Sequence, residues 1–98
     1  MINLDDTSLT IIKTILKAHI PNETVWLFGS RLQKTVKPHA DIDLAIINTK
    51  PIPTLTMALL EDAFSESTLP YKVDIVEWTS LDESFKKIIA SHYEKIQG

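Results

Sequence analysis

The sequence predicts an α/β (α+β) domain in which helices flank a small mixed β-sheet. Apolar residues recur at helical spacing in long segments, while three short runs are rich in β-branched and aromatic residues. Helical and strand segments alternate along the chain, an order that is typical of helices covering a sheet. The length of 98 residues, without an internal repeat or a long linker, predicts a single domain over residues 1–98.

The first half of the chain predicts a helix, a strand and a short helix. Apolar spacing favours a helix over about residues 7–19, which Asp, Thr and Ser side chains can cap and which Pro21 ends. The run TVWLFG, residues 24–29, is β-branched and aromatic and stops at a glycine, so we expect a strand. A short helix is expected from Ser30 to about Lys34.

The second half predicts two further strands and two helices. Residues 41–47 are expected to form a strand, and TLTMALLEDAFSES, residues 54–67, a helix. The run YKVDIVEW, residues 71–78, predicts a third strand. A last helix is expected over residues 83–96, capped by Ser80 or Asp82. Its apolar face would contain Phe85, Ile88, Ile89, Tyr93 and Ile96.

The connection between the first two strands is too short for a parallel crossover. It spans only about ten residues, whereas a parallel connection needs a dozen or more, usually with a full helix. We therefore expect these two strands to be antiparallel or splayed, and the sheet to be mixed.

Composition excludes several classes of function. The formal net charge is −3 and the pI is about 5.5, so no basic surface for long nucleic acid is expected, although a single nucleotide remains compatible. The chain has no cysteine, which excludes disulfides and thiolate chemistry. It shows neither a signal-peptide pattern nor a membrane-spanning run, so we expect a cytoplasmic protein.

Three acidic residues interrupt the apolar predicted strands. Asp41 and Asp43 are two residues apart, so their side chains share one face of the second strand, where they repel each other. Asp74 lies in the third strand, and if the two strands are neighbours it joins the pair. Oxygen ligands suit Mg²⁺, and three carboxylates could hold two ions that activate an attacking oxygen and stabilise the leaving one.

Gly29, Ser30 and Arg31 predict a phosphate-binding turn next to these acids. Glycine permits a sharp turn and a close backbone approach, and a helix that starts at Ser30 would point its N–H groups at phosphate. The Arg31 guanidinium is expected to contact the outer phosphates. Together, a phosphate cradle and a metal site indicate phosphoryl or nucleotidyl transfer from a nucleoside triphosphate.

Each of these assignments has a structural alternative. The acids could line a solvent-facing strand edge, and Lys72 lies close enough in sequence to form an ion pair with Asp74. Glu77 falls on the opposite face of its strand, which favours a role outside the site. Other candidates are more simply explained as solvated or packed residues, namely Lys34, Lys37, His19, His39, His92, Trp26, Trp78 and Tyr93.

The stretch FGSRLQKTVKPHADIDLAII resembles the nucleotidyltransferase superfamily related to DNA polymerase beta. It is similar to the minimal members, the MNT proteins, and with Asp74 the resemblance covers nearly the whole chain. It implies the polymerase beta-like fold, with Asp41, Asp43 and Asp74 as metal ligands and Asp74 as the base for the incoming hydroxyl. Gly29 and Ser30 would hold the triphosphate. Family members often carry a second glycine about where Lys34 stands, which is a departure here.

The resemblance implies transfer of AMP from ATP, with Mg²⁺, to a hydroxyl on a helical HEPN-type partner protein. Such pairs often act as antitoxin and toxin, and a partner in a second chain suits a sequence without room for a helical substrate domain. One alternative is a non-catalytic binding module that neutralises the partner by covering it. Another is a transferase that acts on a small-molecule acceptor.

Overall fold

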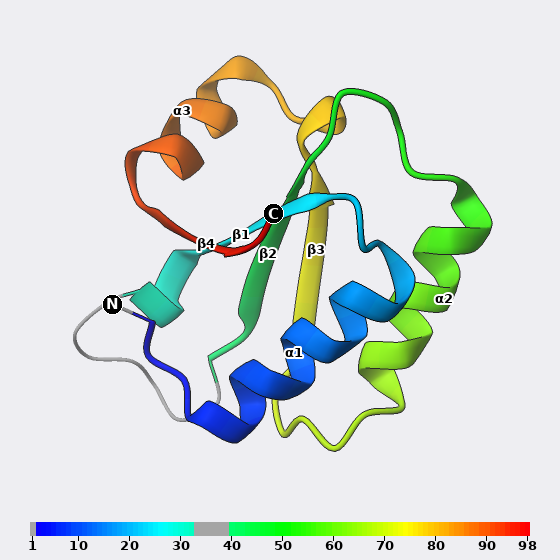
Figure 1. Cartoon of the computed structure of the whole chain (residues 1–98). Coiled ribbons are helices and arrows are strands. Elements are labelled where there is room, and N and C mark those ends of the chain that lie inside the picture. Colours follow the sequence, from blue (N-terminus) through cyan, green and yellow to red (C-terminus); the bar gives the residue numbers. More distant parts are fainter. Residues whose placement is uncertain (1, 33–39) are drawn as a thin grey trace.

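Four strands form one mixed sheet in the order β3-β2-β1-β4 (Figure 1). The computed structural model describes residues 2–32 and 40–98. The strands are β1 (Thr24–Phe28), β2 (Ile42–Ile47), β3 (Val73–Glu77) and β4 (Tyr93–Gln97). Strand β1 pairs antiparallel with both β2 and β4, while β2 pairs parallel with β3. The predicted mixed sheet is confirmed, and of the two arrangements expected for the first two strands, antiparallel or splayed, the structure has the antiparallel one.

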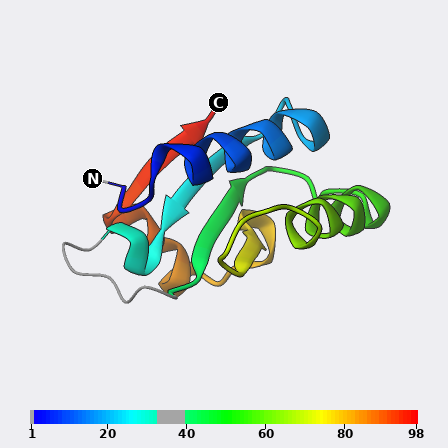
Figure 2. The same cartoon turned by 90° about the horizontal axis from the view of Figure 1, so that it is seen from below.

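Helices cover both faces of this sheet. They are α1 (Asp6–His19), α2 (Thr54–Ser65) and α3 (Glu83–Ser91), with short 3₁₀ turns η1 (Gly29–Leu32) and η2 (Trp78–Ser80). Figure 2 shows α1 and α3 on opposite sides of the sheet. Across the described residues, no helix combines the length and the apolar character that crossing a membrane requires.

The apolar core lies between α1, α2 and one face of the sheet. Alternate residues of β1 and β2 point into it, as a half-buried strand requires. The fully buried side chains include Ile12, Leu16, Val25, Leu27, Ile42, Leu44, Ile46 and Leu60. The opposite face of β2 is therefore left to carry Asp43, and this face is the one that positions the candidate site.

Helix α1 begins close to the expected residue because Asp5 caps it. The Asp5 carboxylate accepts hydrogen bonds from Ser8 Oγ at 2.7 Å and from the Ser8 backbone N–H at 3.0 Å. These bonds stabilise the charged carboxylate, which lowers the pKa of Asp5. The cap satisfies a backbone donor that the first helical turn leaves free.

The prediction of a last helix over residues 83–96 is wrong from residue 92 onward. Helix α3 ends at Ser91, and the following residues form β4 along the free edge of β1. The apolar spacing that suggested one helix is therefore shared between two elements. Tyr93 stacks on Trp26 with ring centroids 3.7 Å apart, Ile96 enters the core, and Ile88 is 67% exposed. The unpaired edge of β1 outweighed the local helical pattern, as tertiary pairing often does.

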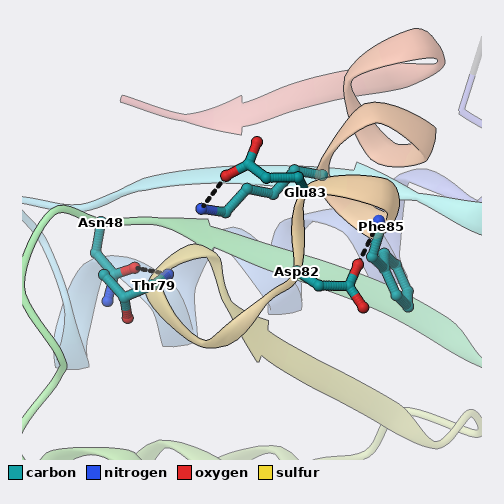
Figure 3. A network of polar contacts seen from close by, with 6 residues as sticks. Asn48, Thr79, Asp82, Glu83 and Phe85 are labelled. Atoms are coloured by element: carbon teal, nitrogen blue, oxygen red, sulfur yellow. Dashed lines mark hydrogen bonds and ion pairs between the residues drawn. The ribbon is translucent and has the colours of Figure 1, made fainter.

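Polar contacts hold the segment that leads into α3 (Figure 3). The Asn48 Oδ1 accepts a hydrogen bond from the Thr79 backbone N–H at 3.3 Å, which ties η2 to the end of β2. The Asp82 Oδ1 accepts from the Phe85 N–H at 2.8 Å and caps α3, as the sequence predicts. Lys86 forms an exposed ion pair with Glu83 at 3.5 Å.

Replacing Asp82 with alanine is expected to destabilise the protein by about 1 kcal/mol, because a helix N-cap is lost. Urea unfolding followed by circular dichroism measures this effect. Asp82→Asn is the matched control, since asparagine caps helices about as well as aspartate. Equal midpoints for the alanine and wild-type proteins would contradict the capping role.

Candidate functional site

Asp43 and Asp74 lie side by side on the face of the sheet away from the core. The parallel register of β2 and β3 pairs Asp43 directly with Asp74. Ile42 and Leu44 flank Asp43 and point into the core, and Val73 and Ile75 flank Asp74 and pack against it. The two carboxylates therefore share the opposite face. Neighbouring strands are about 4.8 Å apart, which brings the two acids within strong electrostatic reach.

This arrangement raises the pKa of Asp43. Burial is the largest cause, because it disfavours the charged form, and the nearby charges of Asp74 and Asp41 add to it. Asp41 itself lies just before β2 and is exposed. A half-buried carboxylate between two other acids favours a bound cation, which would remove the repulsion.

The ion pair between Lys72 and Asp74 anticipated as an alternative is present. The Lys72 Nζ lies 3.5 Å from Asp74 Oδ1, and the two side chains are 73% and 45% exposed. An exposed ion pair of this kind contributes about 0–1 kcal/mol to stability, so its presence does not exclude a role for Asp74 in the site. The Asp74 carboxylate therefore remains accessible beside Asp43.

Gly29 has no room for a side chain because Asp43 packs against it. Its φ of +82° is in the left-handed region, and an added Cβ would collide with the Asp43 carboxylate. The glycine thus brings the turn after β1 directly against the acid on β2. The sequence predicts that the backbone at Gly29 approaches a ligand closely, and in the structure the nearest atoms to an added Cβ belong to Asp43.

Ser30 follows in a single 3₁₀ turn and borders an open pocket of about 350 Å³. The pocket is lined by Phe28, Gly29, Ser30, Phe85, Ile88, Ile89, Ser91 and His92. The sequence does not predict that α3 lines this pocket, because the apolar face of the last helix was expected to pack on the core. The rest of the predicted short helix, to Lys34, lies outside the described residues, as do Lys37 and His39.

Arg31 is buried and is not placed with the carboxylates. It is 4% exposed, its Nη2 donates to Ala40 O at 2.7 Å, and its Nη1 donates to Asn3 O at 3.4 Å. The guanidinium carbon lies 4.0 Å from the centre of the Tyr71 ring. Within the described residues, Nε has no hydrogen-bond partner. These contacts give Arg31 a structural role, and its expected phosphate contact stays a prediction.

Glu77 acts as a hydrogen-bond acceptor at the far end of the same strand pair. Its Oε1 accepts from the Ile52 N–H at 2.7 Å and from Asn48 Nδ2 at 3.1 Å. This agrees with its expected position outside the site. Trp78 packs edge-on against Trp26, with ring centroids 5.4 Å apart, and Trp26 in turn stacks on Tyr93.

Replacing Glu77 with alanine is expected to lower the free energy of unfolding by about 1–3 kcal/mol, because two part-buried donors lose their acceptor. Chemical denaturation measures the loss. Glu77→Gln keeps a carbonyl oxygen at the same position and is expected to recover most of it. If neither Glu77→Ala nor Glu77→Gln lowered the free energy of unfolding, the two hydrogen bonds would contribute nothing to stability.

The residues at the site fit a magnesium ion that is completed by substrate. Among the described residues, no three His, Cys, Asp or Glu side chains are arranged to hold a metal by themselves. Mg²⁺ usually takes one or two carboxylates together with phosphate oxygens and water. The carboxylate oxygens of Asp43 and of the nearby Asp41 and Asp74 match this pattern. The turn at Gly29 lies against Asp43, where a phosphate group could supply the remaining oxygens.

Comparison with known families matches most of the chain. The family described as "Polymerase beta, Nucleotidyltransferase" matches residues 10–97. The "Probable protein adenylyltransferase MntA" of Haemophilus influenzae is 43% identical over 96 residues, which are 98% of this chain and 84% of that protein.

Solved structures share the fold. The MNT antitoxin complex with a tri-AMPylated Shewanella oneidensis HEPN toxin matches with a TM-score of 0.72 and 21% identity, over 97% of this chain and 73% of that chain. A toxin–antitoxin structure with AMP-PNP matches with a TM-score of 0.75 and 24% identity, over 92% and 73% of the two chains.

Proposed function

The chain belongs to the polymerase beta nucleotidyltransferase family, and from this premise we propose that it transfers AMP from ATP to a hydroxyl on a helical partner protein. The observation that carries the proposal is the direct pairing of Asp43 with Asp74 beside the Gly29 turn. This places two carboxylates and a tight backbone turn within one small region. A nucleoside triphosphate and a divalent cation fit these features together.

The reaction forms a bond between the acceptor oxygen and the α-phosphorus of ATP, and it breaks the bond from that phosphorus to the bridging oxygen of pyrophosphate. Asp74 is the group that takes the hydroxyl proton, since it is the accessible carboxylate beside Asp43. Asp41 and Asp43 would hold Mg²⁺, which would neutralise charge on the triphosphate. The backbone at Gly29 and Ser30 orients the outer phosphates.

The choice of AMP and of a protein acceptor rests on the relatives. The Haemophilus influenzae protein is named as a protein adenylyltransferase, and a structural neighbour contains an AMPylated HEPN toxin. Another neighbour contains the ATP analogue AMP-PNP. By this likeness, the chain acts as the antitoxin of a toxin–antitoxin pair and modifies a HEPN-type toxin.

A surface for the partner adjoins the phosphate-binding turn. Phe85 and Ile88 on α3 are 41% and 67% exposed, and both border the pocket beside Ser30. Apolar side chains of this kind favour contact with another protein. They would serve equally in a non-catalytic binding module, which would not need the carboxylates.

The test uses ATP labelled at the α-phosphate, Mg²⁺, and this chain mixed with the protein encoded beside its gene. Label on the partner band, absent with ATP labelled at the γ-phosphate, is the expected result. A stable complex that forms without any label would support the binding module instead. Label only on an added aminoglycoside or other small hydroxyl compound would support the small-molecule alternative.

A further inference from the structure

The guanidinium of Arg31 lies where the parallel strands β2 and β3 begin. Its Nη2 donates to the carbonyl of Ala40, two residues before the first residue of β2. Its guanidinium carbon lies over the ring of Tyr71, 4.0 Å from the ring centre, and Tyr71 is two residues before the first residue of β3. One side chain therefore contacts the approach to each strand.

Pairing between the two strands starts directly after these contacts. The Ile42 N–H donates to Lys72 O at 2.9 Å, and the register then pairs Ile42 with Val73 and Asp43 with Asp74. Side chains alternate along a strand, so a slip of one residue would turn Asp74 toward the core. The relative placement of the two carboxylates thus depends on where this pairing starts.

The same side chain is also tied to the turn that precedes it. Arg31 follows Ser30 directly, and its carbonyl accepts a hydrogen bond from the Asn3 N–H at 2.6 Å, while Nη1 donates to Asn3 O. The glycine against Asp43 is two residues earlier. Arg31 thereby connects the turn, the approach to β2 and the approach to β3.

We propose that Arg31 is a positioning residue that sets the register of β2 against β3, and so the alignment of Asp43 with Asp74. In the transfer reaction, which rests on the function proposed above, Arg31 acts through these carboxylates and touches no phosphate. A lysine would keep the charge, but it lacks the branched guanidinium that donates to Ala40 O while its central carbon lies over the Tyr71 ring. The role therefore requires arginine and not only a positive charge.

The far end of the same strand pair supplies a matched control. Buried Asn48 donates to Glu77 Oε1 and accepts from the Thr79 N–H, so it joins β2 to β3 beyond the site. Asn48→Ala is expected to destabilise the fold without disturbing the start of the pairing. It separates a general loss of stability from a loss of register at the carboxylates.

The test compares Arg31→Lys, Tyr71→Leu and their double variant with Tyr71→Phe and Asn48→Ala. AMP transfer to the partner gives kcat and KM for ATP, at a temperature where circular dichroism shows each variant folded. Amide hydrogen exchange of Ile42, compared with that in Asn48→Ala at matched stability, reports the start of the strand pairing. Tyr71→Leu keeps the test informative if Arg31→Lys does not fold.

Arg31→Lys and Tyr71→Leu are expected to lower kcat by about 10- to 100-fold with KM for ATP near wild type, since small misplacements cost this much. Amide exchange of Ile42 should accelerate in both variants. The double variant should lose no more kcat than the more severe single variant, because the two side chains act together. Tyr71→Phe should behave as wild type. A raised KM with unchanged kcat would overturn the proposal in favour of a phosphate contact. So would unchanged Ile42 exchange.

Failure of the function proposed above gives a separate signature. If the wild-type protein transfers no label, that function is rejected, and the exchange data decide on Arg31 alone. Faster Ile42 exchange in Arg31→Lys than in Asn48→Ala would then support the positioning of β2 and β3. Equal exchange in the two variants would reject it.

Discussion

Replacing Asp41 and Asp43 together with asparagine is expected to reduce AMP transfer by at least about 10³-fold. The two residues would hold the metal ion, and metal stabilisation of developing charge provides several kcal/mol of the barrier reduction. The measurement is the rate of label transfer from ATP labelled at the α-phosphate to the partner. Asp62→Asn, an exposed change on α2, is the matched control and is expected to retain full activity.

The same change at Asp43 is expected to increase stability when no divalent cation is present. Burial and the charges of Asp74 and Asp41 raise the pKa of Asp43 in the folded protein. The folded state therefore binds this proton more tightly than the unfolded state does. The stability that the protonated Asp43 carboxyl contributes is fully present below pH about 3.8, and it is lost as the pH rises through the folded-state pKa. At pH 7 the ionised carboxylate is a cost that asparagine removes.

Melting temperatures measured in EDTA test this sign. Asp43→Asn should melt above wild type at pH 7, and the difference should shrink at pH 3, where both side chains are neutral. A variant that melts below wild type at pH 7 would show that the carboxylate stabilises the metal-free fold. An inactive double variant with higher stability would separate the catalytic role of the acids from any structural one.

Gly29→Ala is the second change with a large expected effect. A non-glycine residue at a φ of +82° costs roughly 1–2 kcal/mol, and the new Cβ would in addition collide with the Asp43 carboxylate. Since Asp43 must move to relieve the contact, we expect transfer to fall by about 100-fold even where the protein is folded. Steady-state transfer rates and urea denaturation measure the two effects on the same sample.

Gly98→Ala provides the comparison for this prediction. Gly98 also has a positive φ, and its Cβ would press against Thr24, which is distant in register from Asp43. It is expected to alter stability without a specific loss of activity. A Gly29→Ala protein with normal kcat would show that Asp43 need not lie against this turn.

The first three strands and the shared face of Asp41 and Asp43 were predictable because local pattern and tertiary role agree there. The run around Asp41 and Asp43 alternates apolar and acidic residues, which fixes both the strand and the face of the acids. The short link from β1 to β2 excluded a parallel crossover and left only an antiparallel or a splayed arrangement. These features depend on residues close together in sequence.

The parts that sequence could not predict depend on distant contacts. The strand β4 forms because β1 has a free edge, and nothing within residues 93–97 signals this partner. Arg31 looked like a phosphate ligand from its place after Gly29-Ser30, yet its contacts are Ala40, Asn3 and Tyr71. A long cationic side chain can serve either role, and only the packing around it decides between them.

Anomalous diffraction from crystals grown with Mn²⁺ and AMP-PNP would locate the metal ion that Asp41 and Asp43 are proposed to hold beside Asp74. We expect a manganese peak bound by the carboxylates of Asp41 and Asp43, next to Asp74, with phosphate oxygens of the nucleotide completing its ligands. A peak at any other set of side chains, or nucleotide bound with no metal beside Asp43, would contradict it.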